Sequence, residues 1–106
     1  MKLFWFTDAI ADLDEIYDYY FALNPRAAAM LYNTILDAAD ILRTHPRIAP
    51  IEPLLEGFTE EYRSLIVAKG KYKLVYYIDN DNVYIVLVFA CRRNPNKIIS
   101  STLKRK

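Results

Sequence analysis

The segment Val83–Ala90 constrains the fold more than any other part of the chain, because all eight of its residues are apolar or aromatic. A strand with one solvated face alternates between apolar and polar side chains, whereas a strand covered on both faces does not. We therefore expect Val83–Ala90 to be the central strand of its sheet. Helices can cover one face. The other face is either sealed by the connector before the strands and the C-terminus or is a partner surface, and we expect the connector to contribute and a partner to complete the cover.

Two further strands precede this segment, at Tyr62–Val67 and Tyr72–Ile78, where β-branched and aromatic residues are frequent. Residues 68–71 contain a glycine and form the first turn. Residues 79–82 read Asp-Asn-Asp-Asn and form the second, since these residues tolerate left-handed backbone conformations. Turns this short predict an antiparallel meander.

The N-terminal part of the chain has the pattern of a short strand followed by a helix. Leu3–Phe6 is the expected strand, and Thr7 is the expected N-cap. An apolar stripe at helical spacing follows, and acids on the opposite face are interpreted as a solvated surface with no apolar pocket that could shift a pKa. The stripe comprises Ile10, Leu13, Tyr17 and Tyr20, and the acids are Asp8, Asp12 and Glu15.

A second helix is predicted to begin at Asn24-Pro25, where Asn24 caps it and Pro25 occupies its first position. Its apolar stripe runs to Leu42, and it ends near Thr44. Two helices joined by so short a link form an antiparallel hairpin. Residues 45–60 have no regular period and are the expected connector. The sequence thus predicts a single α+β domain over residues 1–106, with a β-α-α-β-β-β order and the hairpin packed on a small meander sheet.

Charge is distributed unevenly along the chain although its net value is +1. Residues 1–40 carry seven acids and two bases, whereas residues 61–106 carry three acids and ten bases. A basic end attracts phosphate groups or acidic protein segments, although a chance segregation of solvated charges would look the same. The N-terminus has neither the apolar run of a signal peptide nor that of a membrane span, so we expect a cytoplasmic protein without a membrane partner.

Few residues could carry chemistry. One cysteine, Cys91, and one histidine, His45, cannot form a Cys/His metal site, so neither a metal nor a cofactor is expected. His45 precedes a proline at a helix end, where a capping or surface role is the simpler interpretation. Arg63, Arg92 and Arg93 are better candidates, because guanidinium groups bind phosphate and carboxylate groups with paired hydrogen bonds. For Arg63, a structural salt bridge to Asp14 or Asp18 is the alternative.

The order of these motifs resembles the RelE/ParE toxin superfamily, in its ParE-like, plasmid-stabilisation branch. Trp5-Phe6-Thr7 ends the first strand, and Asp12, Leu13 and Ile16 match the Asp-Leu-x-x-Ile helix. Asn24-Pro25 and the following alanines match the helical hairpin. The remaining matches are Tyr62-Arg63-Ser64-Leu65, Tyr72-x-Leu74-Val75-Tyr76 and Arg92-Arg93-Asn94-Pro95.

This resemblance implies the toxin of a type II toxin–antitoxin pair, neutralised by a cognate antitoxin and acting by binding DNA gyrase. The residues expected to bind the target or the antitoxin are Arg63, Lys71, Lys73, Arg92, Arg93 and Lys97. A RelE-like ribosome-dependent mRNA endoribonuclease is one alternative, with Arg63, Arg92 and Arg93 on the phosphate. Such enzymes usually have a Tyr or His near the C-terminus, and none follows Arg93 here, so an enzyme is the less favoured prediction. A non-toxic interaction domain is the other alternative, and the free protein is expected to form homodimers or to aggregate through its spare apolar face.

Overall fold

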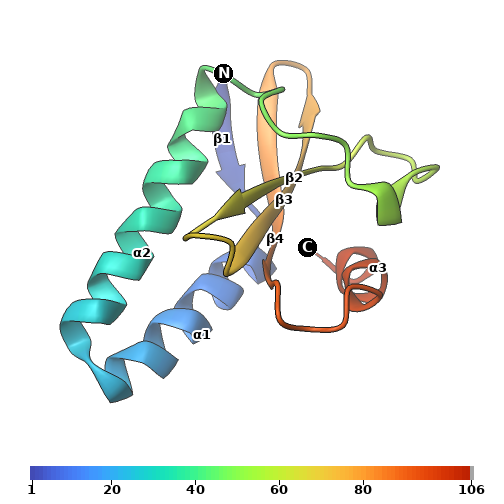
Figure 1. The fold of residues 1–106 in the computed structure, drawn as a ribbon. Coiled ribbons are helices and arrows are strands. Elements are labelled where there is room, and N and C mark those ends of the chain that lie inside the picture. The colour runs from blue at the N-terminus through green and yellow to red at the C-terminus, as the bar shows by residue number, and fades with distance from the viewer. Residues whose placement is uncertain (106) are drawn as a thin grey trace.

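A computed structural model describes residues 1–105 and confirms the predicted α+β fold (Figure 1). One sheet is flanked by a long helical hairpin and by a short C-terminal helix. The elements are β1 (Lys2–Trp5), α1 (Thr7–Leu23), α2 (Pro25–Asp40), β2 (Arg63–Val67), β3 (Tyr72–Asp79), β4 (Asn82–Ala90) and α3 (Lys97–Leu103). Two short 3-10 turns, η1 (Ile41–Arg43) and η2 (Pro53–Leu55), lie between α2 and β2.

The sheet has the order β1-β4-β3-β2, so β4 is an inner strand as its apolar sequence predicts. β2, β3 and β4 form the expected antiparallel meander, while β1 lies parallel to β4. This parallel pairing covers only residues 82–85 of β4. Beyond it, β4 continues to Ala90, and no strand within residues 1–105 pairs with its outer side, so the second half of the strand has an open edge.

The hairpin between β3 and β4 turns as the sequence predicts. Asn80 and Asp81 have φ angles of 48° and 65°, both in the left-handed region that two-residue hairpin turns require. The register then shifts, since Tyr76 is opposite Ile85 whereas Val75 is opposite Leu87. This bulge increases the local twist of β4 just where its pairing with β1 ends.

The helical hairpin covers one face of the sheet. Asn24 caps α2 as predicted, because its Oδ1 accepts hydrogen bonds from the backbone N–H groups of Arg26 (3.1 Å) and Ala27 (3.2 Å). The predicted cap of α1 is wrong: Thr7 is the first helical residue, and Phe6 precedes it without a side-chain cap. Ile10 was expected in the buried stripe but is 47% exposed, and Ala9 is buried instead.

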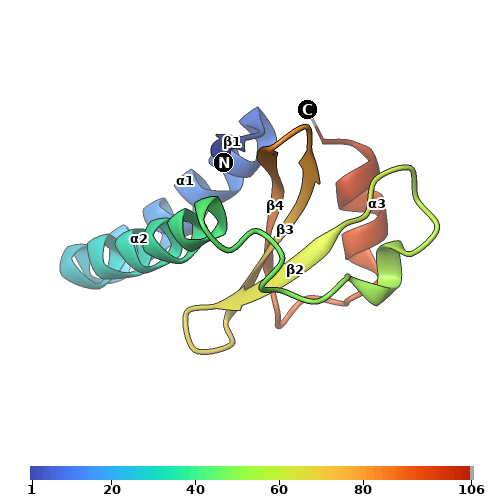
Figure 2. The ribbon, with the colours of Figure 1, turned by 90° about the horizontal axis from the view of Figure 1, so that it is seen from above.

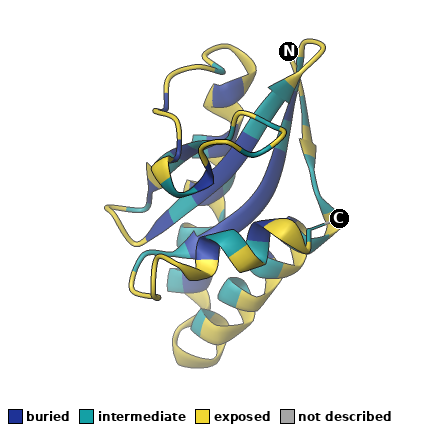
Figure 3. Cartoon of the chain, turned by 90° about the vertical axis from the view of Figure 1, so that its right-hand side faces the viewer, coloured by how far each residue is buried: buried dark blue, intermediate teal, exposed yellow. Residues whose placement is uncertain are grey.

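The other face is covered by α3 and η2 (Figure 2). Ile98 of α3 and Leu55 of η2 are buried against Val75, Leu87 and Phe89 of the sheet. The expected contributions of the connector and the C-terminus are therefore present, but the C-terminus contributes as a helix that the sequence pattern did not predict. The colouring in Figure 3 shows the buried middle strands between the two helical layers.

Candidate binding site

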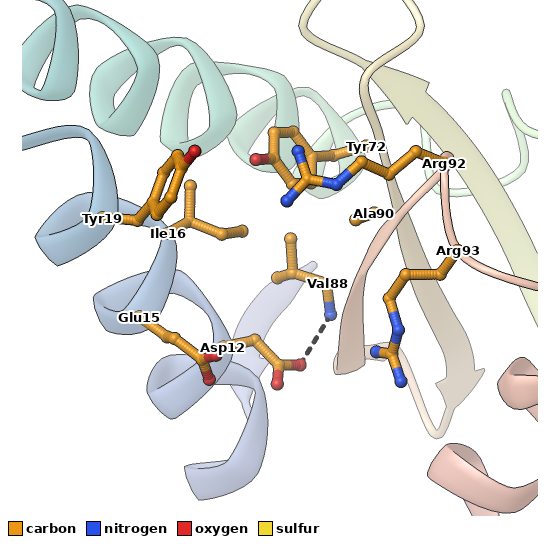
Figure 4. A pocket seen from close by; sticks show the side chains of 9 residues that line it. All are labelled: Asp12, Glu15, Ile16, Tyr19, Tyr72, Val88, Ala90, Arg92 and Arg93. Carbon is orange, nitrogen blue, oxygen red and sulfur yellow. Dashed lines mark hydrogen bonds between the residues drawn. The ribbon is translucent and has the colours of Figure 1, made fainter. Parts of the chain in front are cut away.

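A cavity of about 180 Å³ lies between α1 and the open edge of β4 (Figure 4). One wall comes from α1, the floor from β3 and β4, and the opposite wall from the two arginines that follow β4. The lining residues are Asp12, Glu15, Ile16, Tyr19, Tyr72, Val88, Ala90, Arg92 and Arg93. The cavity therefore has carboxylates on one side and guanidinium groups on the other.

Arg92 and Arg93 are placed by a turn directly after β4, in which the N–H of Arg93 donates to the carbonyl of Ala90 (3.0 Å). The guanidinium carbon of Arg93 lies 5.1 Å from the centre of the Phe89 ring, a cation–π contact that orients this side chain. Among residues 1–105, neither guanidinium forms an ion pair or a hydrogen bond, and both residues are exposed. Their N–H donors are thus available to a carboxylate or a phosphate.

Asp12 lies inside this site, and the prediction that it belongs to a solvated face is wrong. Its Oδ2 accepts hydrogen bonds from the backbone N–H of Val88 (3.0 Å) and from Nη1 of Arg105 (2.8 Å). Burial raises the pKa of the Asp12 carboxyl, and the bonds to Val88 and Arg105 only partly offset this. Asp12 thus satisfies one backbone N–H at the open edge of β4, and its contact with Arg105 links the C-terminal end of the described chain to α1.

Tyr72 forms part of the cavity floor and stays protonated at neutral pH. Burial raises the pKa of its phenol to about 12, and the neighbouring Tyr20 hydroxyl adds to this effect, whereas Arg92 opposes it. A phenol in this state acts as a hydrogen-bond donor and not as a base. The side of the cavity formed by Tyr72 and Arg92 therefore presents hydrogen-bond donors.

Arg63 and Lys73, both predicted binding residues, lie away from this cavity and pair within the protein. Nη1 of Arg63 donates to the carbonyl of Ala49 (2.7 Å), and its Nη2 pairs with Glu61 (3.1 Å). The alternative partners Asp14 and Asp18 were therefore wrong, although an internal ion pair does exist. Nζ of Lys73 pairs with the buried carboxylate of Glu52 (3.0 Å).

Lys71 and Lys97, the other two predicted residues, are exposed at the same end of the sheet as the arginines. Lys71 is in the turn between β2 and β3, and its carbonyl accepts a hydrogen bond from the N–H of Cys91 (2.9 Å). Lys71 and Arg92 line a second hollow of about 300 Å³. Lys97 begins α3 after the loop that carries Arg92 and Arg93. Three of the six predicted residues, Lys71, Arg92 and Arg93, thus line the two hollows where β4 ends.

The open edge of β4 and the role of Asp12 are the parts of the site that sequence reasoning missed. The sequence did contain a signal for the open edge. The expected N-terminal strand, Leu3–Phe6, has four residues and is too short to pair with all eight residues of Val83–Ala90. The single histidine, His45, does not line the cavity, and its Nδ1 lies 2.9 Å from Oγ1 of Thr44. Within the described chain, no cluster of three or more His, Cys, Asp or Glu side chains could hold a metal ion.

The order of the elements and the helical hairpin on one face match the β-α-α-β-β-β architecture that the resemblance to the RelE/ParE superfamily implies. Residues 3–95 match the family described as the ParE toxin of the type II toxin–antitoxin system parDE. The chain therefore belongs to the ParE toxin family.

A solved structure with a similar fold is described as the chromosomal ParDE TA system from P. aeruginosa. The likeness has a TM-score of 0.70 at 23% sequence identity, and it covers 85% of this chain and 95% of that chain. The search among curated proteins found no significant match. No helix within residues 1–105 has the length and hydropathy needed to cross a membrane.

Proposed function

We propose that this chain is a growth-arresting toxin that binds DNA gyrase in the cytoplasm, and that a cognate antitoxin blocks it at the Arg92–Arg93 cavity. Membership of the ParE toxin family supports the toxin role. The observation that carries the placement of the binding site is the pair of guanidinium groups of Arg92 and Arg93, which form no ion pair within residues 1–105. Lys71 and Lys97 extend this positive surface.

The chemistry of the cavity supports binding over strand cleavage. An RNA-cleaving site needs a general base and a general acid poised near the phosphate. Tyr72 remains a neutral phenol, and the Asp12 carboxylate is held by Val88 and Arg105. A protein target that offers carboxylates to Arg92 and Arg93 needs no such groups.

The antitoxin segment that suits this cavity is acidic and extended. A carboxylate on the segment would pair with Arg92 or Arg93 through the bidentate hydrogen bonds that arginine favours. The open edge of β4 next to Ala90 would accept an added strand, a common mode of peptide recognition. Asp12 and Glu15 would repel carboxylates on the segment, so the acidic residues of the segment would lie on the side of Arg92 and Arg93.

Inducible expression in a bacterial host, followed by growth and by mapping of mRNA ends, tests the function. We expect growth arrest with intact transcripts, and inhibition of supercoiling when purified toxin is added to purified gyrase. The protein encoded by the neighbouring gene should relieve both effects. New cuts within translated codons would instead identify an mRNA endoribonuclease, and growth without arrest would identify a non-toxic domain.

Substitution of the arginines tests the placement of the site. Arg92→Ala and Arg93→Ala should each weaken antitoxin binding by roughly tenfold or more, because each removes a charge-assisted hydrogen bond. Arg26→Ala is the matched control, since this exposed arginine lies at the far tip of the helical hairpin and has no ion pair within residues 1–105. Equal losses in all three variants, measured by calorimetry, would contradict this placement.

A further inference from the structure

A continuous row of aromatic rings crosses the sheet at the end far from Arg92 and Arg93. Phe4 of β1 stacks on Tyr84 of β4 with ring centres 5.4 Å apart, and Tyr84 stacks on Tyr77 of β3 at 5.1 Å. Tyr77 meets the edge of Tyr62 at 5.7 Å, and Tyr62 meets Phe58 at 6.4 Å. The row therefore runs from one edge strand across the sheet to the connector.

These rings lie on the face that carries α3, but α3 does not cover them. Tyr62, Tyr77 and Phe58 border the core beneath α3 and remain only half-buried, and Phe4 is 43% exposed. In Figure 3, α3 crosses the lower part of this face, and no helix lies in front of its upper end, near the N-terminus. Part of the aromatic surface thus remains open to solvent.

The charges beside this row are mostly negative. Beside Tyr62 and Phe58, the connector forms a hollow of about 480 Å³ that is also lined by Glu56, Glu60 and Glu61. Glu61 is paired with Arg63, whereas Glu56 and Glu60 form no ion pair within residues 1–105. The negative charge of Glu60 also contributes, after burial, to a raised pKa of both Tyr62 and Tyr77.

The neighbouring strand ends carry charges of both signs. Asp79 at the end of β3 also raises the pKa of Tyr77, although by less than burial and Glu60 do. Lys2, opposite Asn82 at the start of β1, is positive, and so is the N-terminal ammonium of Met1, which donates to the carbonyl of Arg43 (3.0 Å). The excess of negative charge lies at the connector end of the row, at Glu56 and Glu60. The rings and the connector glutamates together form a surface suited to a cation, termed here the aromatic–acidic surface. It consists of Phe4, Tyr84, Tyr77, Tyr62, Phe58, Glu56 and Glu60.

We propose that the aromatic–acidic surface binds an arginine-bearing, cationic segment of a partner protein, separately from the arginine cavity. An aromatic face attracts a cation through its quadrupole, and the planar guanidinium group stacks on such rings better than an ammonium group does. Tyr84 is stacked between Phe4 and Tyr77, so the rings at the two ends of the row are the ones that can present a face to a cation. Glu56 and Glu60 supply carboxylates for the guanidinium N–H donors. The same carboxylates repel phosphate, so nucleic acid does not fit this surface even though exposed rings stack on bases elsewhere.

A titration of the full-length, isotope-labelled protein with an acetylated and amidated (Arg-Gly)4 peptide, followed by NMR, tests this proposal. We expect the ring signals of Phe4, Tyr77 and Tyr84 to shift together, with little change at Tyr19 on the opposite face. The double variant Glu56→Gln/Glu60→Gln should weaken the binding by roughly fivefold or more, since two charge contacts are lost. Phe4→Leu should weaken it by about threefold, because Phe4 is 43% exposed and contributes a stacking surface.

The matched control is Asp14→Asn/Asp37→Asn, which changes the net charge by the same amount at two exposed positions of the helical hairpin. A loss in this control equal to that in Glu56→Gln/Glu60→Gln would show general charge attraction and overturn the proposal. It would equally be overturned by ring shifts on addition of oligothymidine in place of the peptide. Ring shifts that follow protein concentration without peptide would assign the surface to a second copy of this chain.

Discussion

The buried carboxylate of Glu52 joins the irregular connector to the sheet, and its removal should destabilise the fold strongly. Glu52 is only 2% exposed. Its Oε1 accepts hydrogen bonds from the Ser64 hydroxyl (2.9 Å) and from Nζ of Lys73 (3.0 Å), and its Oε2 accepts one from the Leu54 N–H (3.1 Å). One side chain therefore connects η2, β2 and β3.

The expected cost of Glu52→Ala follows from these three contacts. The hydroxyl of Ser64 and the N–H of Leu54 lose their acceptor in a buried place, and each such loss costs about 1–3 kcal/mol. Lys73 is 24% exposed, so its ammonium group can turn toward water and adds less. We expect a total loss of about 3 kcal/mol in the free energy of unfolding. For a chain of this size, that loss lowers Tm by roughly 15 °C.

Urea denaturation followed by the fluorescence of Trp5 measures this effect, because the single tryptophan packs against the core beneath the helical hairpin. Glu61→Ala is the control: its carboxylate is 65% exposed, and loss of such a surface pair costs at most about 1 kcal/mol. A loss of less than about 1 kcal/mol in Glu52→Ala would refute the reasoning, since three contacts to a buried charge should exceed one exposed pair.

The pH dependence offers a second check. Burial alone would raise the pKa of Glu52, but the bonds from Leu54, Lys73 and Ser64 outweigh it and hold the pKa below the ordinary value of 4.5. A carboxyl with a lowered pKa in the folded state stabilises the protein above the unfolded pKa, and this contribution is lost as the pH falls through the folded value. The stability gap between wild type and Glu52→Ala should therefore narrow below pH 4.5. A difference in unfolding free energy between the two proteins that increases below this pH would contradict a lowered pKa of Glu52.

Two further predictions concern the site and the hairpin. In carbon-detected NMR titrations, the pKa of the Asp12 carboxyl should lie above its ordinary value of 3.8. Arg105→Ala should raise this pKa further, because a neighbouring positive charge is removed. A pKa that is the same in Arg105→Ala and in the wild type would exclude the Arg105 contact. Asn24→Ala should lower the free energy of unfolding by about 1 kcal/mol, since the cap of α2 is lost, whereas Asn33→Ala on the exposed face of α2 should cost nothing measurable in the same denaturation assay.

The elements that local chemistry dictates could be predicted from the sequence. The inner position of β4 follows from its uninterrupted apolar run, and the hairpin at Asn80 and Asp81 follows from residues that accept positive φ angles. The cap at Asn24 follows from its side chain and the proline after it. In each case a few neighbouring residues determine the backbone conformation.

The features that were missed depend on contacts between distant parts of the chain. α3 is a short segment with two serines and a threonine, so its helix depends on burying Ile98 against the sheet and not on intrinsic propensity. Asp12 has the spacing of a surface acid, and only the position of Val88 at an open strand edge makes it a hydrogen-bond acceptor. The partner of Lys73 lies in the connector, where no periodic pattern indicates which face Glu52 occupies.

The same contacts explain why counting charges along the chain gave an incomplete picture of its surfaces. Arg63, Lys73 and Arg105 belong to the basic half of the sequence, yet each is neutralised by an internal carboxylate. The positive charge that remains available is therefore concentrated near Arg92 and Arg93, at the end of β4. The glutamates of the connector add negative charge beside the aromatic row at the other end. The two proposed binding surfaces thus differ in the sign of their charge and lie at the two ends of one sheet, which a net charge of +1 would not suggest.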